Sequence, residues 1–244
     1  MKKILFVACI SFVMFSSVVS EAIKIVYFND FAPYSWDEKG EVKGLYKDIT
    51  EELFLKRLSI PTDHKAYPWE RAQRMVMDGS ADVFVTVVTD TRKEYATPSD
   101  RAVFVLNVVV VTYKGHPDFH KMKTFTKISQ FAPYIVSDYI GNGWSKNALK
   151  DLSIREFPDV ASCLRVIADK KADVHFTSTQ IVRYYAIKNA YPLQLVTLPT
   201  IYDSLNMHVF IGKKSKYYTR MSEMNVAIER MFKDGTMKKI LARY

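Results

Sequence analysis

Cysteine is scarce in this sequence, since Cys9 and Cys163 are the only two among 244 residues. Cys9 lies in an N-terminal segment that we expect to be removed, which leaves one thiol in the mature chain. A single thiol cannot form an internal disulfide, so stability must come from packed hydrophobic cores. Hydrophobic residues make up 48% of the chain, a share that excludes a disordered protein.

Long apolar runs are absent after the N-terminus, so no transmembrane helix is predicted there. The N-terminus has a lysine pair, an apolar run over 4–19 and small residues at a cut site after Ser20 or Ala22. This pattern is typical of a secretory signal peptide, which we assign to 1–22. A membrane anchor and lipidation at Cys9 are the alternatives, but the run is shorter than the roughly 20 residues that span a bilayer. We expect an exported, periplasmic protein.

Positive charge is in excess, with a formal net charge of +9. The excess is scattered along the sequence rather than gathered in one basic segment. Nucleic-acid binding needs a basic face and access to nucleic acid, and an exported protein lacks the second. We therefore expect a solvated surface with some attraction for anionic solutes, and no nucleic-acid partner.

A recognisable catalytic set is also missing. Glu70, His64 and His175 are candidate acids or bases, but no nucleophile, base and orienting group occur together. His175 follows an apolar strand pattern typical of an interior histidine. His116 and His120 are too few for zinc, which takes three or four protein ligands. We expect no catalytic residue, no metal site and no cofactor.

One sequence pattern occurs twice. The segment Val-Met-Asp-Gly-Ser-Ala-Asp-Val-Phe at 76–84 is echoed by Ile-Ala-Asp-Lys-Lys-Ala-Asp-Val-His at 167–175. Each copy ends a predicted helix, turns through a polar pair and enters an apolar strand. Strands this apolar are typical of parallel sheets buried on both faces. Two such units predict an α/β fold with two lobes.

The chain is predicted to cross between these lobes twice. Lobe 1 is assigned to 23–112 plus 206–244, and lobe 2 to 113–205. The first crossing follows the β-branched run 103–112, and the second follows a strand at 206–211. Two crossings make a hinge, and small ligands bind in the cleft between hinged lobes.

Two helical regions are expected around this frame. A helix is predicted to begin at Asp48, where Glu51 three residues later completes a capping box. Two terminal helices are predicted, one over 217–233 and one ending at Tyr244. A turn at Asp234-Gly235 separates them.

Five short stretches occur in a fixed order: Ala32-Pro33-Tyr34-Ser35-Trp36, Gly40 through Gly44 to Asp48, Pro68-Trp69-Glu70-Arg71-Ala72, Thr89-Asp90-Thr91-Arg92 and Lys233-Asp234-Gly235-Thr236. Because of these stretches and their order, the sequence from about Ile23 to Tyr244 resembles the bacterial extracellular solute-binding proteins of family 3. The best-known members of that family deliver polar amino acids to transport systems. The resemblance implies a type II periplasmic-binding-protein-like fold, in which two α/β lobes are joined by a two-segment hinge.

The resemblance also implies a set of ligand-binding residues. Arg92 would hold a ligand carboxylate through two parallel hydrogen bonds, which suit the guanidinium fork. Tyr34 and Trp69 would supply aromatic walls, and Thr86, on the strand before Arg92, is a further candidate. The turn Gly141-Asn142-Gly143-Trp144 precedes a helix, and its free amides would face an anion.

This chain departs from the family at both amine contacts. Amino-acid-binding members carry an aspartate five residues after the second aspartate of the lobe 2 repeat, where this chain has Ser178. They carry a serine or threonine five residues before the arginine, where this chain has Val87. An ammonium ion desolvated without a carboxylate is costly. A standard α-amino acid is therefore disfavoured, and hydroxyls such as that of Ser178 would instead donate hydrogen bonds to the ligand.

We therefore expect a periplasmic solute-binding protein that captures a small carboxylate-bearing solute, amino-acid-like or another organic acid. Its partner would be the membrane permease of an ABC transporter, and the protein itself a monomer. A ligand-sensing module for a membrane signalling protein is one alternative. A dehydratase-like enzyme on the same fold is another.

Overall fold

The computed structural model describes residues 21–189 and 194–244. The predicted signal peptide, apart from its last two residues, lies outside the described residues. None of the described helices has the length and apolar character needed to cross a membrane.

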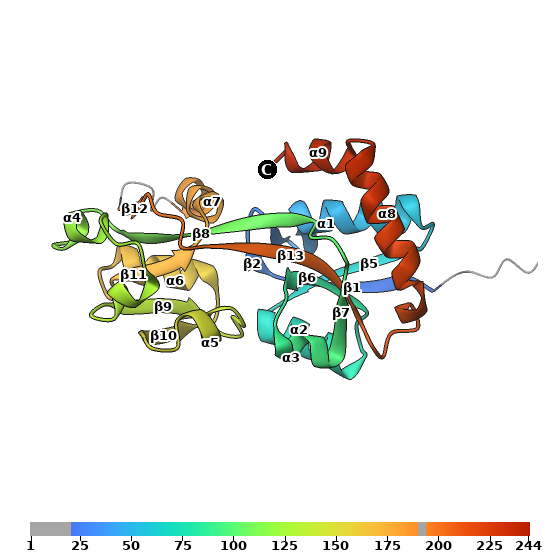
Figure 1. Cartoon of the computed structure of the whole chain (residues 1–244), viewed down its shortest axis with the longest axis horizontal. Helices are drawn as coiled ribbons and strands as arrows, with labels where there is room; N and C mark the ends of the chain where they lie inside the picture. The colour runs from blue at the N-terminus through green and yellow to red at the C-terminus, as the bar shows by residue number, and fades with distance from the viewer. Residues whose placement is uncertain (1–20, 190–193) are drawn as a thin grey trace, which may run out of the picture.

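The molecule has two lobes that share one sheet of ten strands (Figure 1). The strand order is β10-β9-β11-β8-β13-β6-β1-β5, with β12 paired to β8 and β7 paired to β13. Lobe 1 contains β1 (Ile23–Phe28), β5 (Thr62–Tyr67), β6 (Val83–Val87) and β7 (Ala96–Pro98). Lobe 2 contains β9 (Ile135–Tyr139), β10 (Ser153–Phe157), β11 (Val174–Thr177) and β12 (Leu195–Thr197). A small second sheet of lobe 1 is formed by β2 (Asp30–Phe31), β3 (Ser35–Glu38) and β4 (Glu41–Lys43).

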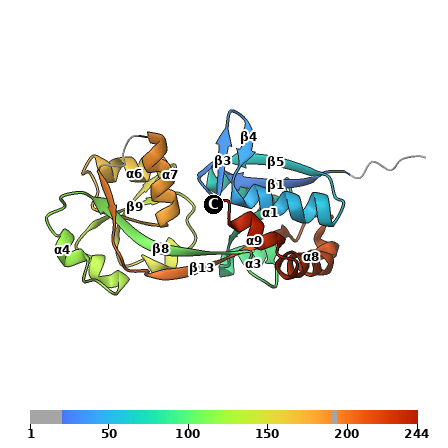
Figure 2. The ribbon, with the colours of Figure 1, turned by 90° about the horizontal axis from the view of Figure 1, so that it is seen from above.

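Helices pack on each lobe separately, as the view from above shows (Figure 2). Those of lobe 1 are α1 (Leu45–Thr50), which continues as a π-helical segment (Glu51–Arg57), α2 (Trp69–Asp78), α3 (Asp90–Tyr95), a 3₁₀ turn (Tyr218–Arg220), α8 (Met221–Lys233) and α9 (Thr236–Leu241). Those of lobe 2 are α4 (Phe119–Met122), a 3₁₀ turn (Ile128–Phe131), α5 (Ser145–Ala148), α6 (Val160–Ala168) and α7 (Thr179–Asn189).

Two long antiparallel strands connect the lobes, β8 (Phe104–Tyr113) and β13 (Asp203–Gly212). The first half of β8 pairs with β13, and its second half pairs with β11 of lobe 2. The second half of β13 pairs with β6 of lobe 1. Each strand therefore belongs to both lobes, and the exact boundaries predicted at 112/113 and 205/206 stay a prediction.

The repeated sequence pattern forms the predicted helix–turn–strand unit in each lobe. In lobe 1, α2 ends at Gly79 in a left-handed conformation (φ 89°), and the chain enters β6. A glycine takes this conformation without steric cost. In lobe 2, the side chain of Asp159 caps α6 by accepting a 2.7 Å hydrogen bond from the Ser162 amide, and β11 follows.

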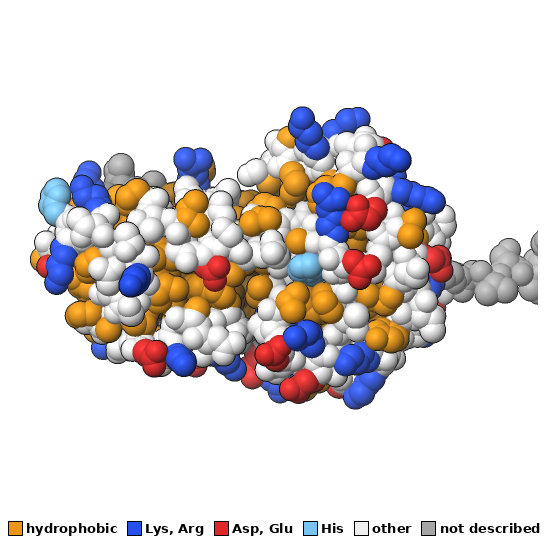
Figure 3. All heavy atoms as spheres, viewed as in Figure 1, with side chains coloured by type: hydrophobic (Ala, Val, Ile, Leu, Met, Phe, Trp, Pro, Cys, Tyr) orange, Lys and Arg blue, Asp and Glu red, His pale blue; other side chains and the backbone are white. Residues whose placement is uncertain are grey.

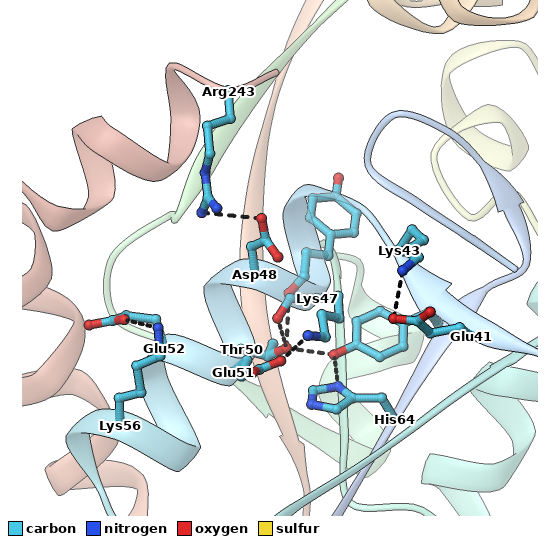
Figure 4. Close-up of polar contacts among 12 residues, drawn as sticks. Glu41, Lys43, Lys47, Asp48, Thr50, Glu51, Glu52, Lys56, His64 and Arg243 are labelled. Carbon is cyan, nitrogen blue, oxygen red and sulfur yellow. Dashed lines mark hydrogen bonds and ion pairs between the residues drawn. The ribbon is translucent and has the colours of Figure 1, made fainter. Parts of the chain in front are cut away.

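The predicted start of the first helix at Asp48 is wrong, because α1 begins at Leu45. Burial decides the start: Leu45 and Ile49 are both fully buried on the core face of the helix. Gly44 allows the entry, since its φ is 118° and a Cβ there would lie 2.5 Å from the Tyr34 carbonyl oxygen. Asp48 does not cap the helix, and it pairs with the Arg243 guanidinium at 3.1 Å instead (Figure 4).

The lobes contact each other directly. Asp30 of lobe 1 accepts a 2.8 Å hydrogen bond from the amide of Ala161, in the first turn of α6 in lobe 2. The other carboxylate oxygen of Asp30 accepts from the Tyr185 hydroxyl of α7. The ring centroids of Phe28 in lobe 1 and Tyr139 in lobe 2 are 5.2 Å apart. These contacts hold the lobes in a closed arrangement.

Candidate ligand-binding site

A cavity of about 720 Å³, including its open mouth, lies between the lobes. On the face in Figure 3, hydrophobic side chains continue across the junction between the lobes. Eight aromatic residues contribute to the lining: Tyr27, Phe28, Phe31, Tyr46, Trp69, Tyr139, Trp144 and Phe176. Among the described residues that line the cavity, Arg92 is the single one that is charged at neutral pH.

Arg92 is positioned by the start of α3. Thr89 caps this helix, its Oγ1 accepting a 3.3 Å hydrogen bond from the Arg92 amide. The side chain then extends toward the lobe interface, where it is 2% exposed. The motif Thr89-Asp90-Thr91-Arg92 therefore directs a cation into the protein.

Neighbouring groups fix the Arg92 guanidinium on several sides. The Gln73 Oε1 atom accepts from Nε at 3.0 Å and from Nη2 at 2.9 Å, and the Val87 carbonyl oxygen accepts from Nη1 at 3.1 Å. The guanidinium carbon lies 5.5 Å from the Trp69 ring centroid. Gly143 of lobe 2 is also close, since a Cβ built there would be 3.0 Å from Nη2 and 3.2 Å from the guanidinium carbon. Arg92 thus meets both lobes.

No described carboxylate forms an ion pair with Arg92. Burial lowers its pKa from the ordinary value, and the nearby hydroxyls of Tyr95 and Tyr139 oppose this shift. A buried cation without an anionic partner is unfavourable. The site is therefore electrostatically incomplete, and an anion would compensate it.

The lobe 2 turn lies against lobe 1, where the Gly141 carbonyl accepts a 3.0 Å hydrogen bond from Gln73 Nε2. Two amides of the turn have partners: Asn142 N donates to the Tyr139 carbonyl oxygen, and Trp144 N donates to Asn142 Oδ1. An anion would therefore be left with the amides of Gly141 and Gly143, and binding of ligand by this turn stays a prediction. Asn142 and Trp144 line the cavity, whereas Gly141 and Gly143 contact Gln73 and Arg92.

A buried carboxyl group, that of Asp138, forms a hydrogen bond to this turn. Asp138 Oδ1 accepts a 2.9 Å hydrogen bond from Asn142 Nδ2. Burial raises the pKa of Asp138 to about 6, although Ser145 and Asn142 lower it through hydrogen bonds. The protonation of Asp138 is therefore linked to the conformation of the turn.

Tyr34 and Ser178, both predicted to meet the ligand, contact each other across the lobes. Their hydroxyl oxygens are 3.0 Å apart, and Ser178 Oγ also accepts from the Ile181 amide at 3.2 Å in the first turn of α7. Tyr34 is 1% exposed and does not line the cavity. Ser178, Trp69 and Thr86 do line it.

Several residues of the site were missed by sequence reasoning. Tyr46 and Tyr139 line the cavity, as does Phe28 at the end of β1. Gln73 lies one helical turn after Trp69 on α2, a spacing that puts the two on one face and was an available signal. Tyr46 lies within the stretch from Gly40 to Asp48, but no local sequence pattern distinguishes it as a ligand-binding residue.

One candidate acid or base from the sequence lies in the core of lobe 2. His175 is an interior histidine, as predicted, with Nδ1 2.7 Å from the Ser137 carbonyl oxygen. Burial lowers its pKa to about 4. Within the described ranges, no group of three or more His, Cys, Asp or Glu side chains is arranged to hold a metal ion.

Residues 23–244 match the sequence profile of the bacterial extracellular solute-binding proteins, family 3. The chain belongs to this family. The probable amino-acid-binding protein YxeM of Bacillus subtilis (strain 168) is 22% identical over 214 residues, which is 87% of this chain and 79% of that protein. The family places the protein among extracellular binding proteins.

Solved structures share the two-lobed type II fold of these binding proteins. An ancestral arginine-binding protein bound to glutamine has a TM-score of 0.77 and 18% identity, over 91% of this chain and 97% of that one. A histidine kinase sensor domain similar to periplasmic binding proteins has a TM-score of 0.80 and 14% identity, over 92% and 96%. The predicted α/β fold of two hinged lobes is confirmed.

Proposed function

We propose that this protein captures a small carboxylate without an α-amino group in the cleft between its lobes, with Arg92 as the anchor. The observation that carries the proposal is the environment of Arg92. It is 2% exposed, is the one charged residue among those described in the cavity lining, and has no described carboxylate partner. An anionic ligand supplies the missing charge.

The geometry of Arg92 suits a carboxylate. A guanidinium has five N–H groups, and the contacts with Gln73 and Val87 use one on Nε and one on each Nη nitrogen. By number, these contacts leave one further N–H on each Nη atom, and the Tyr95 hydroxyl also interacts with the guanidinium. A carboxylate ligand would accept hydrogen bonds from the remaining N–H groups.

An α-ammonium group has no matching partner in the same lining. The described lining contains no Asp or Glu side chain, and Val87 occupies one of the two positions where the family places an amine contact. Ser178 occupies the other, and its hydroxyl is already bonded to Tyr34 and to the Ile181 amide. Burying an ammonium ion here would leave it unpaired.

The protein acts in the periplasm after removal of residues 1–22, as a monomer that passes its solute to the permease of an ABC transporter. The family membership supports this context. The likeness to a sensor domain supports the second candidate, a module that reports ligand to a membrane signalling protein. In both cases ligand docks on lobe 1, and closure of lobe 2 buries it. Binding without catalysis is proposed for both.

A thermal-shift screen tests the proposal. Carboxylates are screened beside the α-amino acids of the same carbon skeleton, because tight binding raises the melting temperature by mass action. We expect shifts with the amine-free acids alone. Shifts with unmodified amino acids, and none with their amine-free counterparts, would overturn the proposal.

A further inference from the structure

Tyr46 is a buried residue of the cavity whose hydroxyl is unpaired. It lies on α1, is 3% exposed and contributes to the cavity lining. Its hydroxyl oxygen has no hydrogen-bond partner among the described residues. Leaving a buried hydroxyl unpaired costs free energy, and such groups are rare in folded proteins. The described residues therefore do not supply the partner of this hydroxyl.

The Tyr46 side chain is held in place. Its ring stacks on that of Tyr34, with centroids 5.7 Å apart and an interplanar angle of 18°. Its backbone carbonyl accepts a 2.9 Å hydrogen bond from Thr50 Oγ1. Thr50 in turn lies 2.5 Å from the Tyr27 hydroxyl, which is 2.8 Å from His64 Nδ1 (Figure 4). This network anchors α1 beside the cavity and so fixes the backbone position of Tyr46.

Tyr46 and Arg92 lie at different parts of the cavity. The Arg92 guanidinium lies 5.5 Å from the Trp69 ring centroid, whereas the Tyr46 ring stacks on Tyr34, which is outside the cavity lining. A ligand held at Arg92 would extend from Trp69 along the aromatic lining on a path toward Tyr46.

The space along this path has flat aromatic walls. The Phe28 ring lies 5.2 Å from that of Tyr139 and 6.2 Å from that of Trp69, centroid to centroid. All three line the cavity. Such surfaces favour a planar or ring-shaped ligand body, which buries a large area against them with little loss of conformational entropy.

We propose that the ligand is a ring-bearing carboxylic acid with a hydroxyl or carbonyl oxygen at the end remote from the carboxylate, and that Tyr46 selects this oxygen by hydrogen bonding. This inference rests on the proposed function, since it takes Arg92 as the carboxylate anchor. It adds a second polar contact to the site and a residue that determines specificity. A ring without the remote oxygen would fit the walls but leave Tyr46 unpaired.

Two acids that differ by one hydroxyl test the inference: hydrocinnamate and its para-hydroxy derivative. Both are titrated calorimetrically into the wild type, Tyr46→Phe and the control Tyr67→Phe, whose ring contacts Arg71 outside the cavity. The wild type and the control should bind the hydroxylated acid about tenfold more tightly. Tyr46→Phe should lose this preference and keep its affinity for hydrocinnamate. Its melting temperature without ligand should not fall, because the hydroxyl it removes has no partner.

Failure of this inference can be told apart from failure of the proposed function. If the wild type binds both acids equally, or Tyr46→Phe keeps the preference, the role of Tyr46 is refuted while carboxylate binding stands. If the wild type binds L-phenylalanine or L-tyrosine and neither acid, both proposals fail. Binding of none of these compounds would refute the ring-bearing class.

Discussion

The side-chain amide oxygen of Gln73 accepts two hydrogen bonds from the Arg92 guanidinium, at 3.0 Å from Nε and 2.9 Å from Nη2. The amide nitrogen of Gln73 donates to the Gly141 carbonyl of lobe 2 at 3.0 Å. One neutral side chain therefore orients the cation and contacts the opposite lobe. Because the amide carries no charge, the positive charge of Arg92 stays available to a ligand.

Replacing Gln73 by glutamate should block the site. The new carboxylate would form an ion pair with Arg92. The cation would then no longer favour the binding of an anionic ligand. We expect Gln73→Glu to lose carboxylate affinity by about a hundredfold or more. Gln73→Leu, which adds no charge but removes the contacts with Arg92 and Gly141, should lose about tenfold in affinity. Equal affinities for the wild type and Gln73→Glu in calorimetry would contradict this role.

Adding a methyl group at Gly143 should hinder closure. Its Cβ would lie 3.0 Å from Arg92 Nη2, and the buried guanidinium is held by Gln73 and Val87 and cannot easily give way. We expect Gly143→Ala to weaken ligand binding by about tenfold or more. Lys150→Ala, an exposed change in the same lobe, is the control. Small-angle scattering should show less compaction for Gly143→Ala at saturating ligand, and wild-type compaction would count against the idea.

Restoring an acid at position 178 should alter ligand choice. Ser178 is fully buried, lines the cavity and accepts the Ile181 amide of α7, a role that aspartate also performs well. We expect Ser178→Asp to bind L-phenylalanine, which the wild type should not, because the carboxylate compensates the ammonium ion. Calorimetry with the amino acid and hydrocinnamate on both proteins measures the switch. A variant that folds but still ignores the amino acid would show that the missing acid is not what excludes it.

Asp138 should make stability depend on pH. Burial raises its folded-state pKa to about 6 from an ordinary 3.8, so the folded state binds the proton more tightly than the unfolded state. The resulting stability is complete below about pH 4 and is lost as pH rises through 6. Asp138→Asn stays neutral, so it should gain roughly 3 kcal/mol on the wild type between pH 4 and pH 7. Denaturant unfolding across this range measures the gap, and parallel pH profiles would refute it.

Local sequence signals predicted much of the frame. Gly79 ends α2 where the repeated pattern predicted a turn, and β6 and β11 follow the two copies as the predicted strands. The start of α1 was mispredicted because the capping pattern at Asp48 is local, whereas the start depends on burial of Leu45 against the core. Local patterns thus succeed where neighbours along the chain decide the conformation.

The contacts that complete the site could not be predicted in this way. Tyr34 and Ser178 are 144 positions apart, and their hydrogen bond depends on how the lobes meet. The same holds for Gln73 and Gly141, which join α2 to the lobe 2 turn. The missing partner of Tyr46 is visible only once every neighbour of its hydroxyl is known.

The central claim is that Arg92 anchors a carboxylate without help from an amine site. The most direct test is calorimetric titration of para-hydroxyhydrocinnamate and L-tyrosine into the wild type and Arg92→Gln, with Arg71→Gln as a charge-matched control. Arg71 packs on Tyr67 outside the cavity. The wild type and the control should bind the acid and not the amino acid, and Arg92→Gln should lose at least about a hundredfold in affinity for the acid. Undiminished binding by Arg92→Gln, or wild-type preference for L-tyrosine, would contradict the account.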